Sequence, residues 1–157
     1  MNCNETFLNE VTHVELIPAS ACTIPVPPMA NSVTELSGCT FGTAAMVIDI
    51  NDNDNYAGTM DSAPTLKTTE KAQAAGFLRQ HDLSVPVRGD FVRVRQAQLT
   101  IEGADFHVVL QTADGIRFLL YSLPNTARAT VEEQFAQEQK QTVKVSMQSM
   151  SNMIKLT

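Results

Sequence analysis

Alternating apolar and polar positions recur along most of the chain, and this pattern predicts β-strands. The first alternation covers residues 10–17 and ends at Pro18, and a nearly continuous apolar run over 44–50 predicts a buried strand. The C-terminal third shows the pattern most clearly. We expect strands there over residues 106–110, 116–121, 127–135 and 142–148, with Ile154 and Leu156 closing the sheet. Asp114 and Gly115 form a typical hairpin turn between the first two of these strands.

The middle of the chain predicts one helix. Between Pro64 and Gln80, apolar positions at helical spacing include Leu66, three alanines, Phe77 and Leu78, so we expect a short helix near 68–80. From Val85 the alternation returns, and residues 91–95 and 96–101 are predicted to be strands. A bulge near Arg95 would separate them, because Arg93 and Arg95 otherwise share the side of Phe91. The pattern therefore predicts a single mainly β domain over residues 1–157, an antiparallel β-sandwich or barrel with one short α-helix.

Residues 18–42 follow neither period. They contain three prolines, Pro25, Pro27 and Pro28. Proline has no backbone donor, so the segment is expected to be extended without being an interior strand. A loop of this length is unusual in a compact domain and often contacts a partner. We therefore expect a long Pro-rich arm that reaches a neighbouring subunit. The apolar anchors of this arm would be Ile24, Val26 and Met29.

Composition describes a globular chain with an uneven charge distribution. The 157 residues are 43% apolar, lack Trp and carry a net charge of −6. The acidic balance argues against a nucleic-acid coat, and no run of apolar residues or N-terminal signal suggests a membrane. Residues 1–66 hold eight acids and no Lys or Arg, whereas residues 67–157 hold all eleven bases and nine acids. This asymmetry is either the chance unevenness of a short chain or a sign that an acidic surface meets a basic one on another copy. Basic contact candidates are Arg93 and Arg95.

Candidate metal and thiol sites are weak. The three cysteines, Cys3, Cys22 and Cys39, lack zinc-site spacing, which favours reduced thiols and leaves a Cys22–Cys39 disulfide as the alternative. Residues 51–55 are all Asn or Asp, and together with Asp49 they match the first positions of a calcium-binding EF-hand loop. The required Gly and Glu are replaced by Asp54 and Met60. We therefore expect a polar turn and no metal.

Catalytic chemistry is not indicated. The three histidines, His13, His81 and His107, are isolated in the sequence, and no nucleophile, phosphate-binding or dinucleotide motif occurs. The sequence therefore predicts a protein that is not an enzyme and needs no cofactor.

The C-terminal third resembles a known structural family. An apolar strand, the Asp114–Gly115 turn, a strand ending in residues 122–125 and two alternating strands rich in Thr, Gln and Ser are similar to small β-sandwich tail-tube proteins of tailed bacteriophages and related injection machines. The resemblance covers about residues 105–157. It implies a tube subunit whose strands join in rings around a β-lined and acidic lumen, while arms or loops bind the next ring.

The partners implied by the resemblance are copies of the chain itself and other virion proteins, with DNA only passing through a lumen. The implied location is the virion, in a tail tube or a connector, after synthesis in the host cytoplasm. The alternative is a bacterial β-sandwich binding or adhesion module. Such a module needs exposed aromatic side chains, whereas most of the nine aromatic residues here occupy expected core positions.

Overall fold

The computed structural model describes residues 2–30, 32–73, 76–88, 91–134 and 140–157. Within them the chain is mainly β with one α-helix, as the alternating pattern predicted. No described helix is long and apolar enough to span a bilayer.

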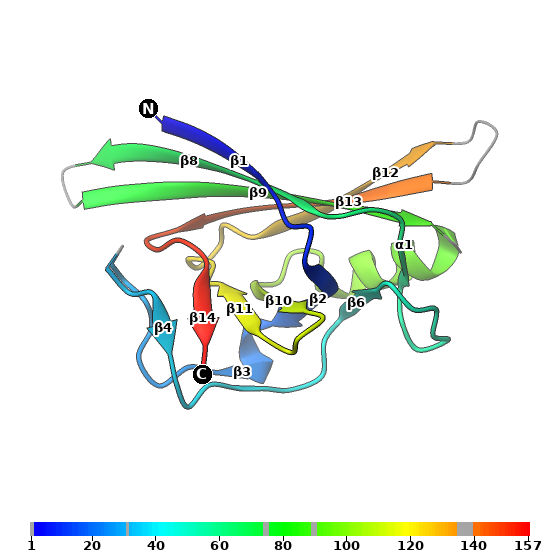
Figure 1. The fold of residues 1–157 in the computed structure, drawn as a ribbon, viewed down its shortest axis with the longest axis horizontal. Coiled ribbons are helices and arrows are strands. Elements are labelled where there is room, and N and C mark those ends of the chain that lie inside the picture. Colours follow the sequence, from blue (N-terminus) through cyan, green and yellow to red (C-terminus); the bar gives the residue numbers. More distant parts are fainter. Residues whose placement is uncertain (1, 31, 74–75, 89–90, 135–139) are drawn as a thin grey trace.

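Most of the described strands join in one mixed sheet that does not close into a barrel (Figure 1). Its upper layer contains β1 (Asn2–Phe7), β8 (Thr65–Gln73), β9 (Gly76–Arg88), β13 (Lys140–Ser149) and β12 (Arg128–Gln134). Its lower layer contains β6 (Met46–Asp49), β2 (Val11–Pro18), β10 (Phe106–Thr112), β11 (Arg117–Leu120), β14 (Ile154–Leu156) and the short β4 (Glu35–Leu36). The strand β7 (Gly58–Met60) connects the layers, since it pairs with both β6 and β9. The pairs β6–β7 and β14–β4 are parallel, and the other pairs of this sheet are antiparallel.

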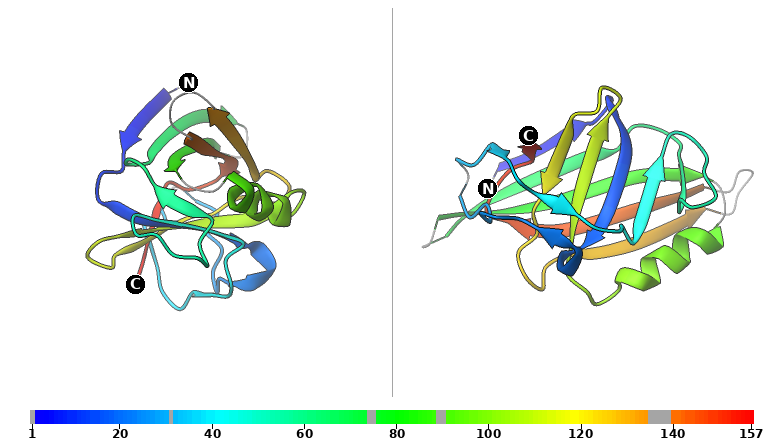
Figure 2. Two further views of the ribbon diagram at one scale, coloured as in Figure 1. Left: turned by 90° about the vertical axis from the view of Figure 1, so that its right-hand side faces the viewer. Right: turned by 90° about the horizontal axis from the view of Figure 1, so that it is seen from below.

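The main core lies between the two layers (Figure 2, left). Alternate residues of β13 point into it, so that Val143, Val145 and Met147 are almost fully buried, as their alternation predicted. They belong to one apolar cluster with Leu16 of β2 and Leu110 of β10. The two layers are therefore held together by a shared apolar interior.

A second core explains why the Pro-rich segment is not confirmed as an arm. The far face of the lower layer carries Ile17, Val109, Leu119 and Ile154, all buried. The segment 18–42 folds back over them through the turn η1 (Ala19–Ala21) and the two-stranded sheet of β3 (Cys22–Thr23) and β5 (Thr40–Phe41). Four of its apolar side chains pack on this second core, because an uncovered face would leave large aliphatic residues in water; they are Ile24, Val33, Leu36 and Phe41.

The helix prediction was wrong in position. Residues 65–73 and 76–88 form the antiparallel pair β8–β9, although the alanines and leucines of 64–80 have helical spacing. The stretch also contains three threonines, which suit a strand, and pairing with β1 and β13 on either side outweighs the helical preference of its alanines.

The single α-helix, α1 (Phe91–Ile101), replaces the two strands predicted over 91–101. Its buried contacts come from Val94 and Ile101, with Ala97 packed between them, and these positions have the i, i+3, i+7 spacing of one helix face. The alternation of Val92 and Val94 with arginines concealed this period. The expected bulge near Arg95 is therefore absent, and a register shift instead occurs in β10 between Gln111 and Thr112.

Candidate assembly interface

The strand β1 is one outer edge of the upper layer. It pairs with β8 along all six of its residues, from Asn2↔Glu70 to Phe7↔Thr65, and it stands at the end of the sheet order. Figure 1 shows it along the upper side of the molecule. Among the described strands no partner occupies its other side. Its outward backbone groups are therefore available to a further strand.

The opposite edge of the upper layer is partly covered. The helix α1 lies beside β12 (Figure 2, right), and the Gln98 side-chain amide donates to the carbonyl of Ala129 over 3.2 Å. Arg95 of α1 donates to the carboxylate of Glu133 on β12, and this ion pair lowers the pKa of Glu133. The two edges of this layer thus differ in how open they are.

The outward face of the upper layer is polar and its charges alternate. Lys67 stands opposite Asp82 in the β8–β9 register, and Lys144 pairs with Glu132 across β13 and β12 at 3.0 Å. Ser84 and Ser146 lie between these rows. The exposed Arg128 lies on the same face, where it lines a hollow of about 390 Å³ together with Lys67, Asp82 and Lys144.

The expected apolar anchors of segment 18–42 do not share one environment. Val26 and Met29 are 68% and 55% exposed, so both are available for contact with another molecule. Ile24 packs against the second core and is half-buried. Of the three anchors, only Val26 and Met29 can be reached without unfolding the segment.

The two expected basic contacts lie on α1 and are engaged within the chain. The guanidinium of Arg93 donates to the carbonyls of Asn53, Asp54 and Tyr56, each over 3.2 Å. It thereby fixes the Asn/Asp-rich turn against the helix. Arg95 is bound to Glu133 but its side chain stays 57% exposed. Arg95 is therefore the more accessible of the two.

The exposed side of α1 presents two aliphatic side chains that sequence reasoning missed. Val92 is 60% exposed and Leu99 is 63% exposed. They are seven residues apart, so they lie on one side of the helix about 10 Å from each other. Arg95 and Gln96 lie between them. The helical period would have revealed this row only if the segment had first been identified as a helix.

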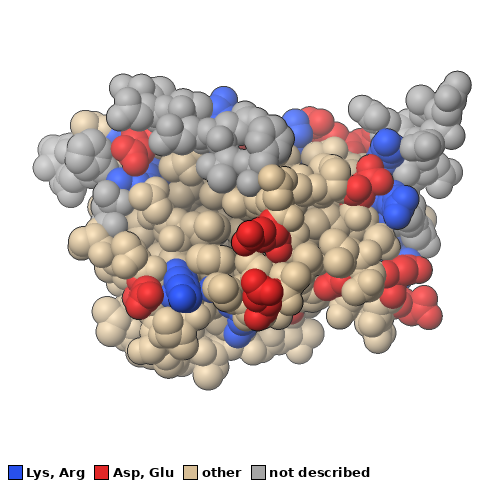
Figure 3. Space-filling model, in the orientation of Figure 1, with Lys and Arg blue, Asp and Glu red and all other residues tan. Residues whose placement is uncertain are grey.

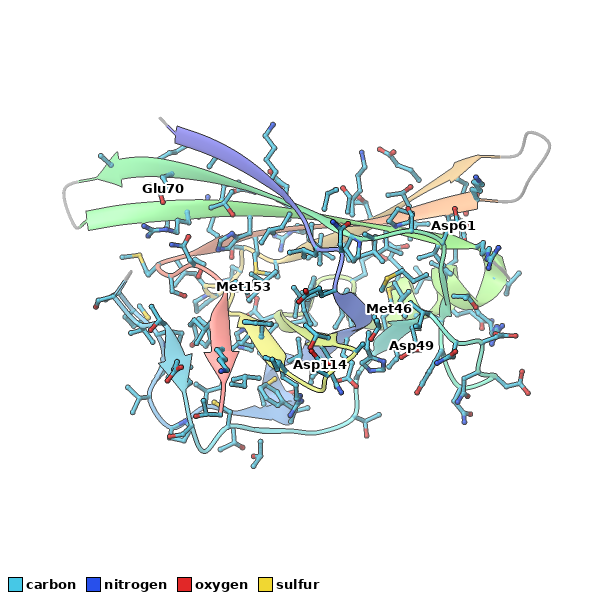
Figure 4. The ribbon with its side chains drawn as sticks, in the orientation of Figure 1. Met46, Asp49, Asp61, Glu70, Asp114 and Met153 are labelled. Atoms are coloured by element: carbon cyan, nitrogen blue, oxygen red, sulfur yellow. The ribbon has the colours of Figure 1, made fainter. Side chains whose placement is uncertain are left out.

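A groove of about 370 Å³ opens beside Met153, on what we call the front face, the side turned to the viewer in Figure 4. The sequence did not predict this groove. It is lined by Leu8, Asn9, Glu10, Val11, Thr112, Phe118 and Met153. These residues come from three separate parts of the sequence, so no local motif announces them. The Ala113 N–H donates to the carbonyl of Glu10 over 3.3 Å, which brings the β10–β11 turn with Asp114 to the rim. Figure 4 labels Met153 and Asp114 in this region, and Figure 3 shows acidic side chains in the middle of the same face.

The Asn/Asp-rich stretch forms the expected turn. One carboxylate oxygen of Asp49 accepts the N–H of Asn51, and the side-chain carbonyl of Asn53 accepts that of Asn55. The other oxygen of Asp49 contacts His13. No group of metal-ligating side chains occurs in the described parts of the chain.

His13 connects two carboxylates on the far face of the lower layer. Its Nδ1 lies 2.6 Å from Asp49 and its Nε2 lies 2.9 Å from Glu15. Both ring nitrogens must carry a proton to donate to both carboxylates. The hydrogen bond to Glu15 is the largest cause that raises the pKa of His13, and together with Asp49 it outweighs the effect of burial. The protonated ring therefore joins β2 to β6, where His13 stands opposite Asp49 in register.

We expect this triad to stabilise the fold less at alkaline pH. A histidine whose folded pKa lies above its ordinary value contributes fully below 6.5, and the contribution is lost as the pH rises through the folded pKa. Urea unfolding between pH 6 and 9 measures, at each pH, how much the free energy of unfolding of wild type exceeds that of His13→Gln. This difference should shrink as the pH rises, and a constant difference would contradict the charged triad.

A serine and a histidine also meet in the interior, without the accessibility that catalysis needs. The Ser122 hydroxyl lies 3.3 Å from Nδ1 of His107 but donates to the Phe106 carbonyl at 2.6 Å. Ser122 is 3% exposed and His107 is 6% exposed. The pair therefore acts as a link between β10 and the end of β11.

Cys22 and Cys39 are free thiols in the structure. Burial raises the pKa of Cys22 to about 11, which disfavours its reactive thiolate form. The side chain of Cys3 lies outside the described side chains.

Comparison with known proteins gives no indication of function, so the proposal below is argued from the surfaces described above. No family model, no curated protein and no solved structure matches the chain.

Proposed function

We propose that the chain is a non-enzymatic structural subunit of a multimeric assembly, a bacteriophage tail tube or a related tail or connector protein of the virion. The observation that carries the proposal is the open edge of β1. This strand belongs to the upper layer, in which the pair β8–β9 reaches to one side of the molecule and the pair β12–β13 reaches to the other (Figure 1). A regular strand edge of six residues, about 20 Å long, is normally protected from pairing with other chains. In this proposal a strand of the next copy protects it.

The polar outward face of the upper layer supports the same function. If copies join through their strand edges, this face becomes a continuous inner or outer wall. Its alternating Lys67–Asp82 and Lys144–Glu132 charges would let a polyanion such as DNA pass without strong binding. Arg128 adds a third cation to these two pairs, so in this form the lumen would not be acidic, in contrast to the lumen implied by the family resemblance.

The adhesion-module alternative gains no support from the exposed side chains. Among the residues whose side chains the structure describes, the large apolar ones that are exposed are Val26, Met29, Ile50, Val92, Leu99 and Ile116. All of them are aliphatic or methionine, whereas carbohydrate-type binding surfaces stack ligands on aromatic rings.

Assembly can be tested through the β1 edge with two adjacent proline substitutions, Asn4→Pro and Glu5→Pro. Consecutive residues of an antiparallel strand alternate between the ladder and the outer edge. One substitution therefore removes an outward N–H, and the other removes a donor from the ladder to β8. We expect wild type to sediment as multimers and to show rings or tubes by electron microscopy. The outward variant should keep its melting temperature and lose assembly, whereas the ladder variant should melt earlier.

A wild-type protein that remains monomeric over the full accessible concentration range would contradict the proposed function. If wild type and both proline variants all form multimers, the proposed function is still supported, but the β1 edge is not the contact between copies.

A further inference from the structure

We infer that the groove on the front face receives the exposed side of α1 from a second copy of the chain. This inference rests on the proposed function as an assembling subunit and names the surfaces of one contact. On the groove side these surfaces are Leu8, Val11, Phe118 and Met153 with the acidic rim of Glu10 and Asp114. On the helix side they are Val92 and Leu99 with Arg95 between them.

The groove has the character of a receptor for aliphatic side chains. Leu8 and Val11 are 8% and 6% exposed, so they form a firm floor, while Phe118 and Met153 are only partly buried and form its walls. Ile116 on the adjoining turn is 39% exposed and enlarges the apolar area beside it. A groove of about 370 Å³ with these walls exceeds what water requires and suits the insertion of an aliphatic side chain.

The exposed side of α1 has the matching form. A helix that docks in a groove presents apolar anchors at positions such as i and i+7, with polar residues between and around them. Val92 and Leu99 satisfy this spacing, and more than half of each residue's surface is exposed to solvent.

Charge selects a second copy as the occupant. The groove is lined by Glu10, and Asp114 follows Ala113 on the turn that is hydrogen-bonded to Glu10, while the row on α1 carries the guanidinium of Arg95, which is paired with Glu133 and still 57% exposed. Glu10 belongs to the base-free first 66 residues and Arg95 to the part that holds every base. Opposite charges on the two surfaces would steer the encounter and set its register, while the aliphatic anchors would contribute most of the affinity.

The two surfaces occupy different parts of the molecule, so the contact is head-to-tail. The groove is lined by Met153, which Figure 4 labels well away from α1, and α1 lies at one side of the molecule beside β12 and β6 (Figure 1). A contact between two different surfaces leaves one of each unsatisfied in a dimer, and it therefore continues into a ring or a filament. This geometry agrees with a subunit of a tube.

The test uses two variants of the full chain, each of which removes one surface. The helix variant is Val92→Asp/Leu99→Asp, and the groove variant is Glu10→Arg/Asp114→Arg. All four residues are exposed, so both variants should fold with a melting temperature close to that of wild type. Sedimentation velocity should show that each variant alone associates at least tenfold more weakly than wild type. A control with a charge reversal at another exposed acid, Glu35→Arg, should associate like wild type.

Mixing the two variants is the decisive measurement. Each retains the surface that the other lacks, so an equimolar mixture should associate more strongly than either variant alone at the same total protein concentration. A mixture that associates no more strongly than the separate variants, or variants that assemble like wild type, would overturn the inference while wild-type multimers still support the proposed function. A monomeric wild type would instead overturn the proposed function itself. If a double variant melts several degrees below wild type, the single substitutions Leu99→Ser and Glu10→Gln carry the same expectations.

Discussion

Acidification from pH 6.5 to about 4 should remove about 3 kcal/mol of folding free energy through His107 alone. Burial lowers the pKa of His107 to about 4, from an ordinary value of 6.5. Within this window the unfolded chain binds a proton that the native chain does not, so stability falls as the pH falls. Each unit by which the folded pKa lies below the unfolded pKa corresponds to about 1.4 kcal/mol of folding free energy. The loss of stability levels off once the pH is below the folded pKa.

The surroundings of His107 explain why the native state resists the proton. Nδ1 accepts the N–H of Ser122 over 3.0 Å, so a proton at Nδ1 would face another donor. The ring is also stacked on Tyr121, with ring centroids 4.4 Å apart. His81 adds to the loss of stability in acid, because burial lowers its pKa. The hydrogen bond that Nε2 donates to the carbonyl of Ser151 opposes this shift but is outweighed by burial.

The matched variant for this prediction is His107→Asn, whose side-chain carbonyl can replace Nδ1 as the acceptor. It should be less stable than wild type at pH 7, because part of the stacking is lost. Urea unfolding at half-unit steps from pH 7 to pH 4 should then show a shallower decline for the variant, so that the two free energies converge by about 3 kcal/mol at most. Parallel declines would show that His107 titrates normally in the folded chain.

Gly58→Ala should destabilise the fold by about 1–3 kcal/mol through overpacking. Gly58 lies on β7, where the two layers join, and it is buried. A Cβ at this position would overlap Cγ1 of Val87 and would come within 3.5 Å of Cγ2 of Val94. Val87 and Val94 are fully buried, so neither can move aside without displacing β9 or α1.

The control for Gly58→Ala is a double-mutant cycle with Val87→Ala. Val87→Ala by itself leaves a cavity and should also destabilise the fold. Because it removes the methyl group that the new Cβ would overlap, the double variant should be more stable than the sum of the two single effects requires. Additive losses in urea unfolding would mean that the overlap is relieved elsewhere.

The candidate surfaces could be predicted only in part. The sequence alone identifies Val26 and Met29 as apolar residues in a Pro-rich segment, and the structure exposes both. It does not identify the groove, because Leu8, Phe118 and Met153 are distant in sequence and meet only when β1, β11 and the turn before β14 are placed. It also does not identify the row on α1, because the alternation around Val92 and Val94 has the period of a strand.

The sequence by itself determined those elements whose period is strong and whose turns are local. The strands β2, β6, β10, β11, β12, β13 and β14 lie where alternation or an apolar run predicted them. Asp114 and Gly115 make the turn between β10 and β11, with Gly115 in the left-handed conformation that glycine tolerates. In these segments the local preference and the burial in the final fold agree, so a single sequence suffices.

Only the tertiary structure decided the rest, because there the local preference is weak or misleading. The alanines around residue 72 favour a helix, yet β8 is a strand because β1 and β9 pair with both of its edges. The segment 18–42 lacks any period, and it folds back because a second apolar face of the lower layer needs cover. Pairing partners and uncovered faces come from residues far along the chain, and no window of the sequence contains them.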